Sequence, residues 1–233
     1  MEQLPLGVRL RDTARLASFV PAGGNGEAFE LIAAGPGTAP QVLWIWGRPG
    51  TGKTHLLQAA CAAVAEAGGS ASYVDLASAA VPGWLEGCEN LDLVCLDGLE
   101  AVAADAGWND AIFRLHTLMQ DNATRLYVAS TVPPASLAFR LPDLRSRLLA
   151  ASVHQLYELE EAAQVEALRR RAAGRGLDLS PEGALYLVHR LPRDMHSLCA
   201  VLDRLDEASL IAQRRLTVPF LRQALEAQGV DAT

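Results

Sequence analysis

Short apolar runs alternate with amphipathic stretches over the first two thirds of the chain. An apolar run bounded by turn residues is typical of a strand that is buried on both faces of a parallel sheet. Such runs predict five strands, at residues 42–46, 71–75, 91–96, 125–130 and 153–157. Between them, apolar positions recur at helical spacing over residues 53–67 and 108–120. Strands that alternate with helices predict an α/β fold with a five-stranded parallel sheet.

The pattern changes near residue 159, after which helical spacing continues without a strand. It predicts four helices, at residues 160–173, 181–190, 192–214 and 219–228. Pro181 and Pro192 suit the first turn of a helix, where the missing N–H of proline has no helical partner. We therefore expect an N-terminal segment over residues 1–12, an α/β domain over 13–158 and a small all-helical lid domain over 159–233.

Composition narrows the classes of protein that this chain can represent. The chain has 233 residues, of which 50% are hydrophobic and 20% are charged, and its formal net charge is −7. These fractions exclude a disordered chain, and the acidic balance argues against a protein that coats DNA through a basic surface. No apolar run reaches membrane-spanning length, and the N-terminus lacks the apolar core of a signal peptide. The four cysteines are scattered without a CxxC pair, so we expect a cytoplasmic protein with no membrane association and no zinc site.

The segment that joins the first strand to the first helix carries a complete nucleotide-binding motif. Residues 47–54, GRPGTGKT, match the pattern G-x-x-x-x-G-K-[ST]. The glycines let backbone N–H groups turn toward a phosphate, and the start of the helix adds its positive end. Lys53 is the only lysine among the twenty basic residues; we expect it to reach the β- and γ-phosphates and Thr54 to hold Mg²⁺. The residues expected to bind nucleotide here are Gly47, Arg48, Pro49, Gly50, Thr51, Gly52, Lys53, Thr54 and His55.

A second half of the nucleotide site is expected at the end of the third strand. Residues 93–97, LVCLD, are an apolar strand that delivers the Asp97 carboxylate near Mg²⁺. Many ATPases of this architecture carry a second acid at the next position, where it activates the attacking water. Here that position is Gly98, and Glu100 can substitute only if the loop bends suitably. The sequence therefore predicts nucleotide binding with slow hydrolysis.

Three further polar positions have two interpretations each. Thr131 follows the fourth strand, where a polar residue often faces the γ-phosphate, although Ser and Thr also commonly end strands. Arg147 is either an arginine finger that acts on a neighbour's nucleotide or part of a solvated helix face. A cation such as Arg193, in the expected first turn of a helix, opposes the helix dipole unless it meets an anion such as phosphate. The neighbouring Asp194 offers a purely local partner for it.

The first residues of the chain place apolar side chains beside a glutamine. Gln3, Leu4 and Leu6 form the segment Gln-Leu-Pro-Leu, and an exposed apolar tail of this kind often docks into a groove of a partner. Short patterns of this kind also recur by chance.

Taken together, these motifs resemble the AAA+ ATPases, and within them the DnaA-related Hda family of regulatory inactivators of DnaA. The resemblance runs along nearly the whole chain. The segments that carry it are QLPLGVRL (3–10), LASFVPAGGN (16–25), LWIWGRPGTGKTHLLQAAC (43–61), LDLVCLDGLEAVAAD (91–105), LPDLRSRL (141–148) and RLPRDMHSLCAVLDRLDEASLIAQRRLTVPFL (190–221).

The resemblance implies a role for each matching position. Gln3, Leu4 and Leu6 match a motif that docks on the DNA polymerase sliding clamp, with Gly7-Val8 following where relatives are more apolar. The matches at nucleotide-contacting positions are Leu10, Phe19 and Pro21 (adenine packing), Thr131 (sensor 1, where relatives often have Asp), Arg147 (arginine finger in trans) and Arg193 (sensor 2). It implies a regulator of replication initiation that binds ADP or ATP with Mg²⁺ and stimulates ATP hydrolysis by DnaA. Such a protein reaches DNA mainly through the clamp and is a possible homo-oligomer.

Two other functions share part of the pattern. A helicase loader or clamp-loader-like ATPase also has the P-loop, Asp97 and Arg147, but it needs a competent base after Asp97 and hydrolyses ATP by itself. A small-molecule kinase needs a pocket for its acceptor and leaves the N-terminal motif unexplained. Weak intrinsic ATPase activity is therefore the property that separates the regulator from the loader.

Overall fold

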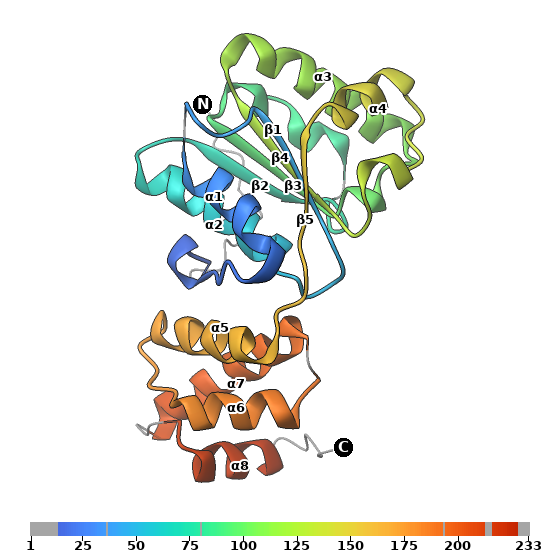
Figure 1. Cartoon of the computed structure of the whole chain (residues 1–233). Coiled ribbons are helices and arrows are strands. Elements are labelled where there is room, and N and C mark those ends of the chain that lie inside the picture. The colour runs from blue at the N-terminus through green and yellow to red at the C-terminus, as the bar shows by residue number, and fades with distance from the viewer. Residues whose placement is uncertain (1–13, 36, 80, 193, 213–215, 228–233) are drawn as a thin grey trace. The chain divides into compact units, whose positions relative to one another are not determined.

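The computed structural model describes two compact units (Figure 1). The residues that it describes are 14–35, 37–79, 81–192, 194–212 and 216–227. The first unit contains Gly24–Arg48 and Lys53–Tyr157, together with residues 14–16. The second contains the residues from Glu158 onward and also two short stretches, Ala17–Gly23 and Pro49–Gly52.

The first unit is built on the predicted five-stranded parallel sheet. Every strand pair in it is parallel, and the strand order is β2-β3-β4-β1-β5. The strands are β1 (Val42–Trp46), β2 (Ala71–Asp75), β3 (Leu93–Asp97), β4 (Arg125–Ser130) and β5 (Ser152–Gln155). The last strand was expected to run to residue 157 but ends at Gln155. Beyond it, the backbone N–H of Leu156 still donates to the Trp46 carbonyl oxygen over 2.7 Å, and that of Tyr157 donates to the Asn25 side chain over 2.7 Å.

Helices lie on both sides of this sheet, with α1 and α2 on one side and α3 and α4 on the other (Figure 1). The helices of the unit are α1 (Gly26–Ala33), α2 (Lys53–Glu66), α3 (Ala106–Asn122) and α4 (Pro142–Leu149). The sequence pattern did not predict α1, which is two turns long and starts after Asn25 without a side-chain cap. Short 3₁₀ turns connect the larger elements: η1 (Leu16–Ser18), η2 (Gly23–Asn25), η3 (Pro82–Leu85), η4 (Cys88–Asn90), η5 (Leu99–Ala101) and η6 (Pro134–Ser136).

The strands present alternate residues to the two helical layers. Trp44, Leu96 and Val128 pack in one cluster with α3 and α4 and are fully buried. On the opposite face, the Cys95 thiol lies 3.6 Å from the Leu57 carbonyl oxygen of α2 and donates to it. Because side chains alternate across a strand, Asp97 shares the α2 face of β3 with Cys95.

The second unit contains the four predicted helices. They are α5 (Glu161–Ala173), α6 (Pro181–Arg190), α7 (Met195–Ala212) and α8 (Val218–Ala227), and they enclose an apolar core that includes Leu168, Leu187 and Leu202. One expected boundary is wrong, because α7 begins at Met195 and not at Pro192. The Asp194 carboxylate accepts a 2.8 Å hydrogen bond from the backbone N–H of Ser197, which is the geometry of an N-cap. Asp194 therefore supplies the local start signal of this helix.

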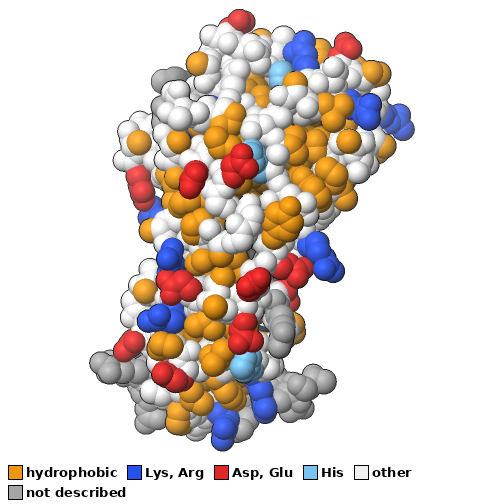
Figure 2. All heavy atoms as spheres, viewed as in Figure 1, with side chains coloured by type: hydrophobic (Ala, Val, Ile, Leu, Met, Phe, Trp, Pro, Cys, Tyr) orange, Lys and Arg blue, Asp and Glu red, His pale blue; other side chains and the backbone are white. Residues whose placement is uncertain are grey.

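The surface of the described residues agrees with the mixed composition. Figure 2 shows acidic and basic side chains interspersed on the viewed face. No helix in the described part of the chain is long and apolar enough to cross a membrane.

Candidate functional site

The P-loop lysine is buried against its own loop. Lys53 is the first residue of α2 and only 9% exposed, and its ammonium donates to the carbonyl oxygens of Gly47 over 2.7 Å and Arg48 over 2.9 Å. Burial lowers the pKa of Lys53, whereas the nearby carboxylates of Asp97 and Glu100 raise it. The Lys53 ammonium therefore lies between the carbonyl groups of its loop and the carboxylates of Asp97 and Glu100.

Thr54 and Asp97 meet at the carboxyl end of β3, as the motifs predicted. The Thr54 hydroxyl donates to Asp97 Oδ2 over 2.6 Å. Hydroxyl and carboxylate oxygens are both ligands of the hard type that Mg²⁺ prefers. In nucleotide sites Mg²⁺ is bound by one or two such protein oxygens, together with phosphate oxygens and water. The pair therefore fits the Mg²⁺ that the motifs imply. Thr54 and Asp97 would hold such an ion, which would neutralise negative charge on the phosphates of a bound nucleotide.

Tyr73 is a site residue that the sequence analysis missed. It lies on β2, and its hydroxyl donates to the same Asp97 Oδ2 atom over 2.8 Å. Burial, with the neighbouring Asp97 carboxylate as the next cause, raises the pKa of Tyr73, so the phenol stays protonated and remains a donor. One sequence feature could have pointed to it. Tyr73 brings a hydroxyl into a largely apolar strand, and that strand precedes the one that ends in Asp97.

The loop after Asp97 bends so that Glu100 approaches Lys53. Gly98 has φ +76° and ψ +40°, a left-handed conformation that glycine adopts without strain, and the turn η5 follows it directly. The negative charge of Glu100 acts on Lys53, and its buried Oε2 atom has no hydrogen-bond partner among the described residues. The structure thus supplies the bend that a role for Glu100 requires, while position 98 itself offers no acid.

Ser130 and Thr131 end the strand beside the P-loop. Ser130 pairs with Trp46 in the sheet, and its carbonyl oxygen accepts from the Gly47 N–H over 3.2 Å. The buried Ser130 hydroxyl accepts from Trp44 Nε1 over 2.8 Å and donates to the Val132 carbonyl oxygen over 2.5 Å. It therefore has a structural role in the strand end. Thr131 is half-buried at the next position.

Arg147 is anchored on α3 instead of extending into solvent. Its guanidinium stacks 4.4 Å from the centre of the Phe113 ring, and Nη1 donates to the Thr117 hydroxyl over 2.9 Å. The start of α4 is fixed as well, because Asn109 Oδ1 accepts from the backbone N–H groups of Arg140 and Leu141 over 2.9 and 3.2 Å. The side chain is half-buried, and its charge is held against α3.

A family model matches part of the C-terminal unit. Residues 161–225, which contain most of the helical core of that unit, match the model of the Hda lid domain. The C-terminal helices are therefore similar to an Hda lid domain.

Solved structures share the AAA+ fold. Domain III of the replication initiation protein DnaA from Thermotoga maritima is 19% identical, with 94% of this chain and 98% of that chain covered and a TM-score of 0.76. AMPPCP-bound DnaA from Aquifex aeolicus is 23% identical, with coverage of 77% and 61% and a TM-score of 0.63. A DNA replication initiation factor is 21% identical, with coverage of 82% and 64% and a TM-score of 0.68. The chain thus spans less than two thirds of the last two proteins.

Within the second unit, Phe19 lies against the P-loop glycines. A Cβ atom at Gly52, which has φ +96°, would lie 3.1 Å from the Phe19 ring, and one at Gly50, with φ +82°, would lie 3.4 Å from Asp194 Cβ. The left-handed backbone favours glycine at both positions, and at Gly52 the space beside the Phe19 ring is also tight. Arg170 holds the Phe19 segment by donating to its carbonyl oxygen over 3.0 Å.

The remaining predicted residues are not gathered into one described cluster. His55 Nε2 lies 3.3 Å from the Arg15 carbonyl oxygen, and Pro21 is exposed. Five others lie outside the described residues: Gln3, Leu4, Leu6, Leu10 and Arg193.

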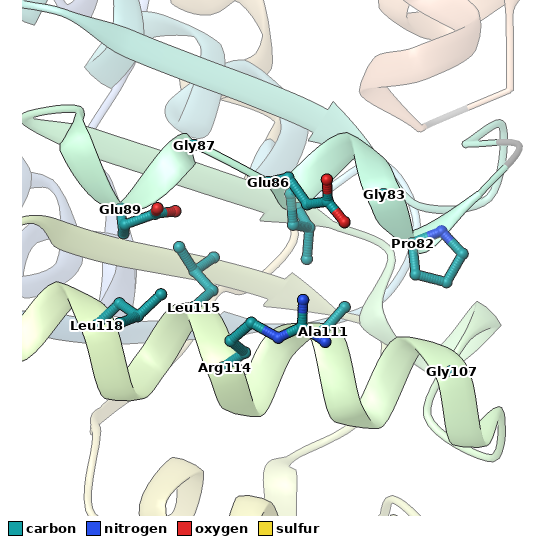
Figure 3. A pocket seen from close by; sticks show the side chains of 11 residues that line it. Pro82, Gly83, Glu86, Gly87, Glu89, Gly107, Ala111, Arg114, Leu115 and Leu118 are labelled. Atoms are coloured by element: carbon teal, nitrogen blue, oxygen red, sulfur yellow. The ribbon is translucent and has the colours of Figure 1, made fainter.

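A separate groove lies between α3 and the turns η3 and η4 (Figure 3). It has a volume of about 230 Å³, and Leu115 and Leu118 of α3 line it opposite the segment that carries Glu86 and Glu89. None of the residues predicted from the motifs lines it.

Proposed function

We propose that this chain is a nucleotide-bound regulator of replication initiation that stimulates hydrolysis of the ATP held by DnaA. The match of residues 161–225 to the Hda lid domain is the observation that carries the proposal. The AAA+ fold and the P-loop support it, because a regulator of this type has to meet the AAA+ domain of DnaA.

The proposed ligand is ADP or ATP with Mg²⁺. In this proposal Lys53 binds the phosphates, and Thr54 and Asp97 hold the metal ion. Support comes from the convergence of these three side chains and from the AMPPCP in the similar DnaA structures. The adenine is proposed to lie near Leu10, Phe19 and Pro21. Thr131 and Arg193 complete the list of proposed nucleotide contacts.

Arg147 is the proposed arginine finger. In this proposal its guanidinium stabilises the negative charge that develops on the phosphoryl group transferred in the DnaA active site. The stacking on Phe113 and the hydrogen bond to Thr117 support this role, because a preorganised cation stabilises charge better than a freely moving one.

Docking on the sliding clamp is proposed for Gln3, Leu4 and Leu6. Replacing both leucines by alanine, Leu4→Ala with Leu6→Ala, is expected to abolish capture of the chain by the immobilised clamp, because the two apolar anchors are removed from a short motif. The measurement is a pull-down, with ADP binding of the double variant as a control for folding. Unchanged capture would refute the clamp-docking proposal.

One observation favours the second candidate, an ATP-hydrolysing loader. Glu100 lies near Lys53 with a buried carboxylate oxygen that has no hydrogen-bond partner among the described residues, and such an oxygen can accept a proton from water.

We expect the isolated chain to turn over ATP more slowly than once per minute, since position 98 carries no acid (an order-of-magnitude expectation, roughly that of an unassisted P-loop site). Phosphate release by the purified chain measures this rate, and rapid turnover that Glu100→Gln abolishes would favour the loader.

A further inference from the structure

The Tyr73 hydroxyl is part of a chain of hydrogen bonds that ends on Asp97. Tyr73 is only 6% exposed, at the centre of β2. Its hydroxyl and the Thr54 hydroxyl both donate to Asp97 Oδ2, over 2.8 and 2.6 Å. The two donors therefore hold one oxygen of the carboxylate and leave Oδ1 outside this pair of bonds.

Gln58 continues the chain on the helix side. It follows Thr54 by four residues in α2, so both side chains project from the same face of the helix. Gln58 is 6% exposed, and its side chain acts on the Tyr73 hydroxyl as a hydrogen-bonding group that lowers the pKa of the phenol. Since the single proton of that hydroxyl goes to Asp97, Gln58 has to donate through its amide group. The order of donors is Gln58 to Tyr73 to Asp97.

We propose that Tyr73 is a positioning residue that orients the Asp97 carboxylate for magnesium-dependent nucleotide binding. This inference rests on the proposed nucleotide-binding function. Tyr73 is set next to β3 by the parallel ladder that pairs it with Cys95 and pairs Asp75 with Asp97. A donor fixed by a sheet loses little freedom when it holds a carboxylate, and partners of this kind tune the affinity of metal sites.

Tyr73 differs from Thr54 in what it can do once nucleotide is bound. The Thr54 hydroxyl is itself an expected magnesium ligand, so its oxygen serves two partners. The Tyr73 hydroxyl comes from the neighbouring strand, and among the contacts described it interacts with Asp97 and Gln58. It can therefore keep one carboxylate oxygen in place while the other remains available.

The test compares binding of a fluorescent ADP analogue to the full chain with Mg²⁺ and with EDTA. Tyr73→Phe keeps the ring and removes the hydroxyl, and we expect it to weaken binding about tenfold in Mg²⁺ and to leave binding in EDTA unchanged. The double variant Tyr73→Phe with Gln58→Leu removes both hydrogen-bond partners, so it should unfold at nearly the wild-type temperature and still show the magnesium defect.

A matched control comes from the buried tyrosine two strands away. Tyr127 is fully buried in β4 beside Arg125, and Tyr127→Phe removes a buried hydroxyl in the same sheet. It should bind the analogue like the wild type under both conditions. Asp97→Asn should show the full magnesium defect.

The outcomes separate the two proposals. If Tyr73→Phe keeps the wild-type response to Mg²⁺, or loses affinity equally in EDTA, the positioning role is refuted while nucleotide binding stands. If the wild-type chain binds the analogue under neither condition, the proposed nucleotide-binding function is refuted, and the role of Tyr73 with it.

Discussion

Replacing Lys53 by alanine is expected to weaken nucleotide binding about 100-fold, because a charge-assisted phosphate contact worth about 3 kcal/mol corresponds to two tenfold steps in affinity. The loop is already shaped around this ammonium, which donates to two of its carbonyl groups. Equilibrium titration with a fluorescent ADP analogue measures the loss, and thermal unfolding without nucleotide monitors the fold.

Two further variants make the Lys53 result specific. Lys53→Arg keeps the charge, but the planar guanidinium does not reproduce the compact ammonium that donates to the Gly47 and Arg48 carbonyl oxygens, so we expect it to bind as poorly as Lys53→Ala. Arg169→Ala removes a half-exposed cation of α5 that pairs with Glu166, and it should bind like the wild type. If Lys53→Ala binds the analogue with wild-type affinity, the proposal that the P-loop binds the nucleotide is wrong.

Replacing Arg147 by alanine is expected to reduce the stimulation of DnaA ATP hydrolysis about 1000-fold, which is the lower end of the contribution of an arginine finger. Capture by the sliding clamp should be unaffected, because the docking motif is proposed to lie in the first residues of the chain. The measurement follows release of phosphate from DnaA that is preloaded with labelled ATP, in the presence of clamp-loaded DNA.

The matched control lies on the same helix. Arg145 is exposed on α4, two residues before Arg147, and Arg145→Ala should stimulate DnaA like the wild type. Arg147→Lys keeps a positive charge but not the fork of donors, and we expect it to stay defective. Loss of clamp capture together with stimulation in Arg147→Ala would point to a disrupted fold and contradict the assignment.

Local patterns predicted the five strands and most of the helices, although not α1, because each predicted element depends on neighbouring residues. The apolar runs gave the strands directly, and the P-loop lies between β1 and α2 as expected. The start of α7 was misplaced because Pro192 and Asp194 are both helix-start signals two positions apart, and the cap hydrogen bond to Ser197 decides between them. The order of the strands depends on pairing between distant segments, which no local pattern contains.

The candidate site was predicted only where one motif contains all the partners. Thr54 and Asp97 meet as expected, since each belongs to a known half of the site. Tyr73 joins them through the register of β2 against β3, and a sequence without pairing information does not contain that register. Ser130, which also lies at this edge of the sheet, uses its hydroxyl for structure instead. The hydroxyl accepts a hydrogen bond from Trp44 and donates one to the Val132 carbonyl oxygen.

We propose that this chain switches DnaA by promoting hydrolysis of the ATP that DnaA holds. The most direct measurement mixes the purified chain with DnaA preloaded with labelled ATP, with and without clamp-loaded DNA, and counts the ADP that remains on DnaA. The account predicts conversion to ADP-bound DnaA only when both the chain and the loaded clamp are present. Unchanged ATP-bound DnaA in the complete mixture would contradict it.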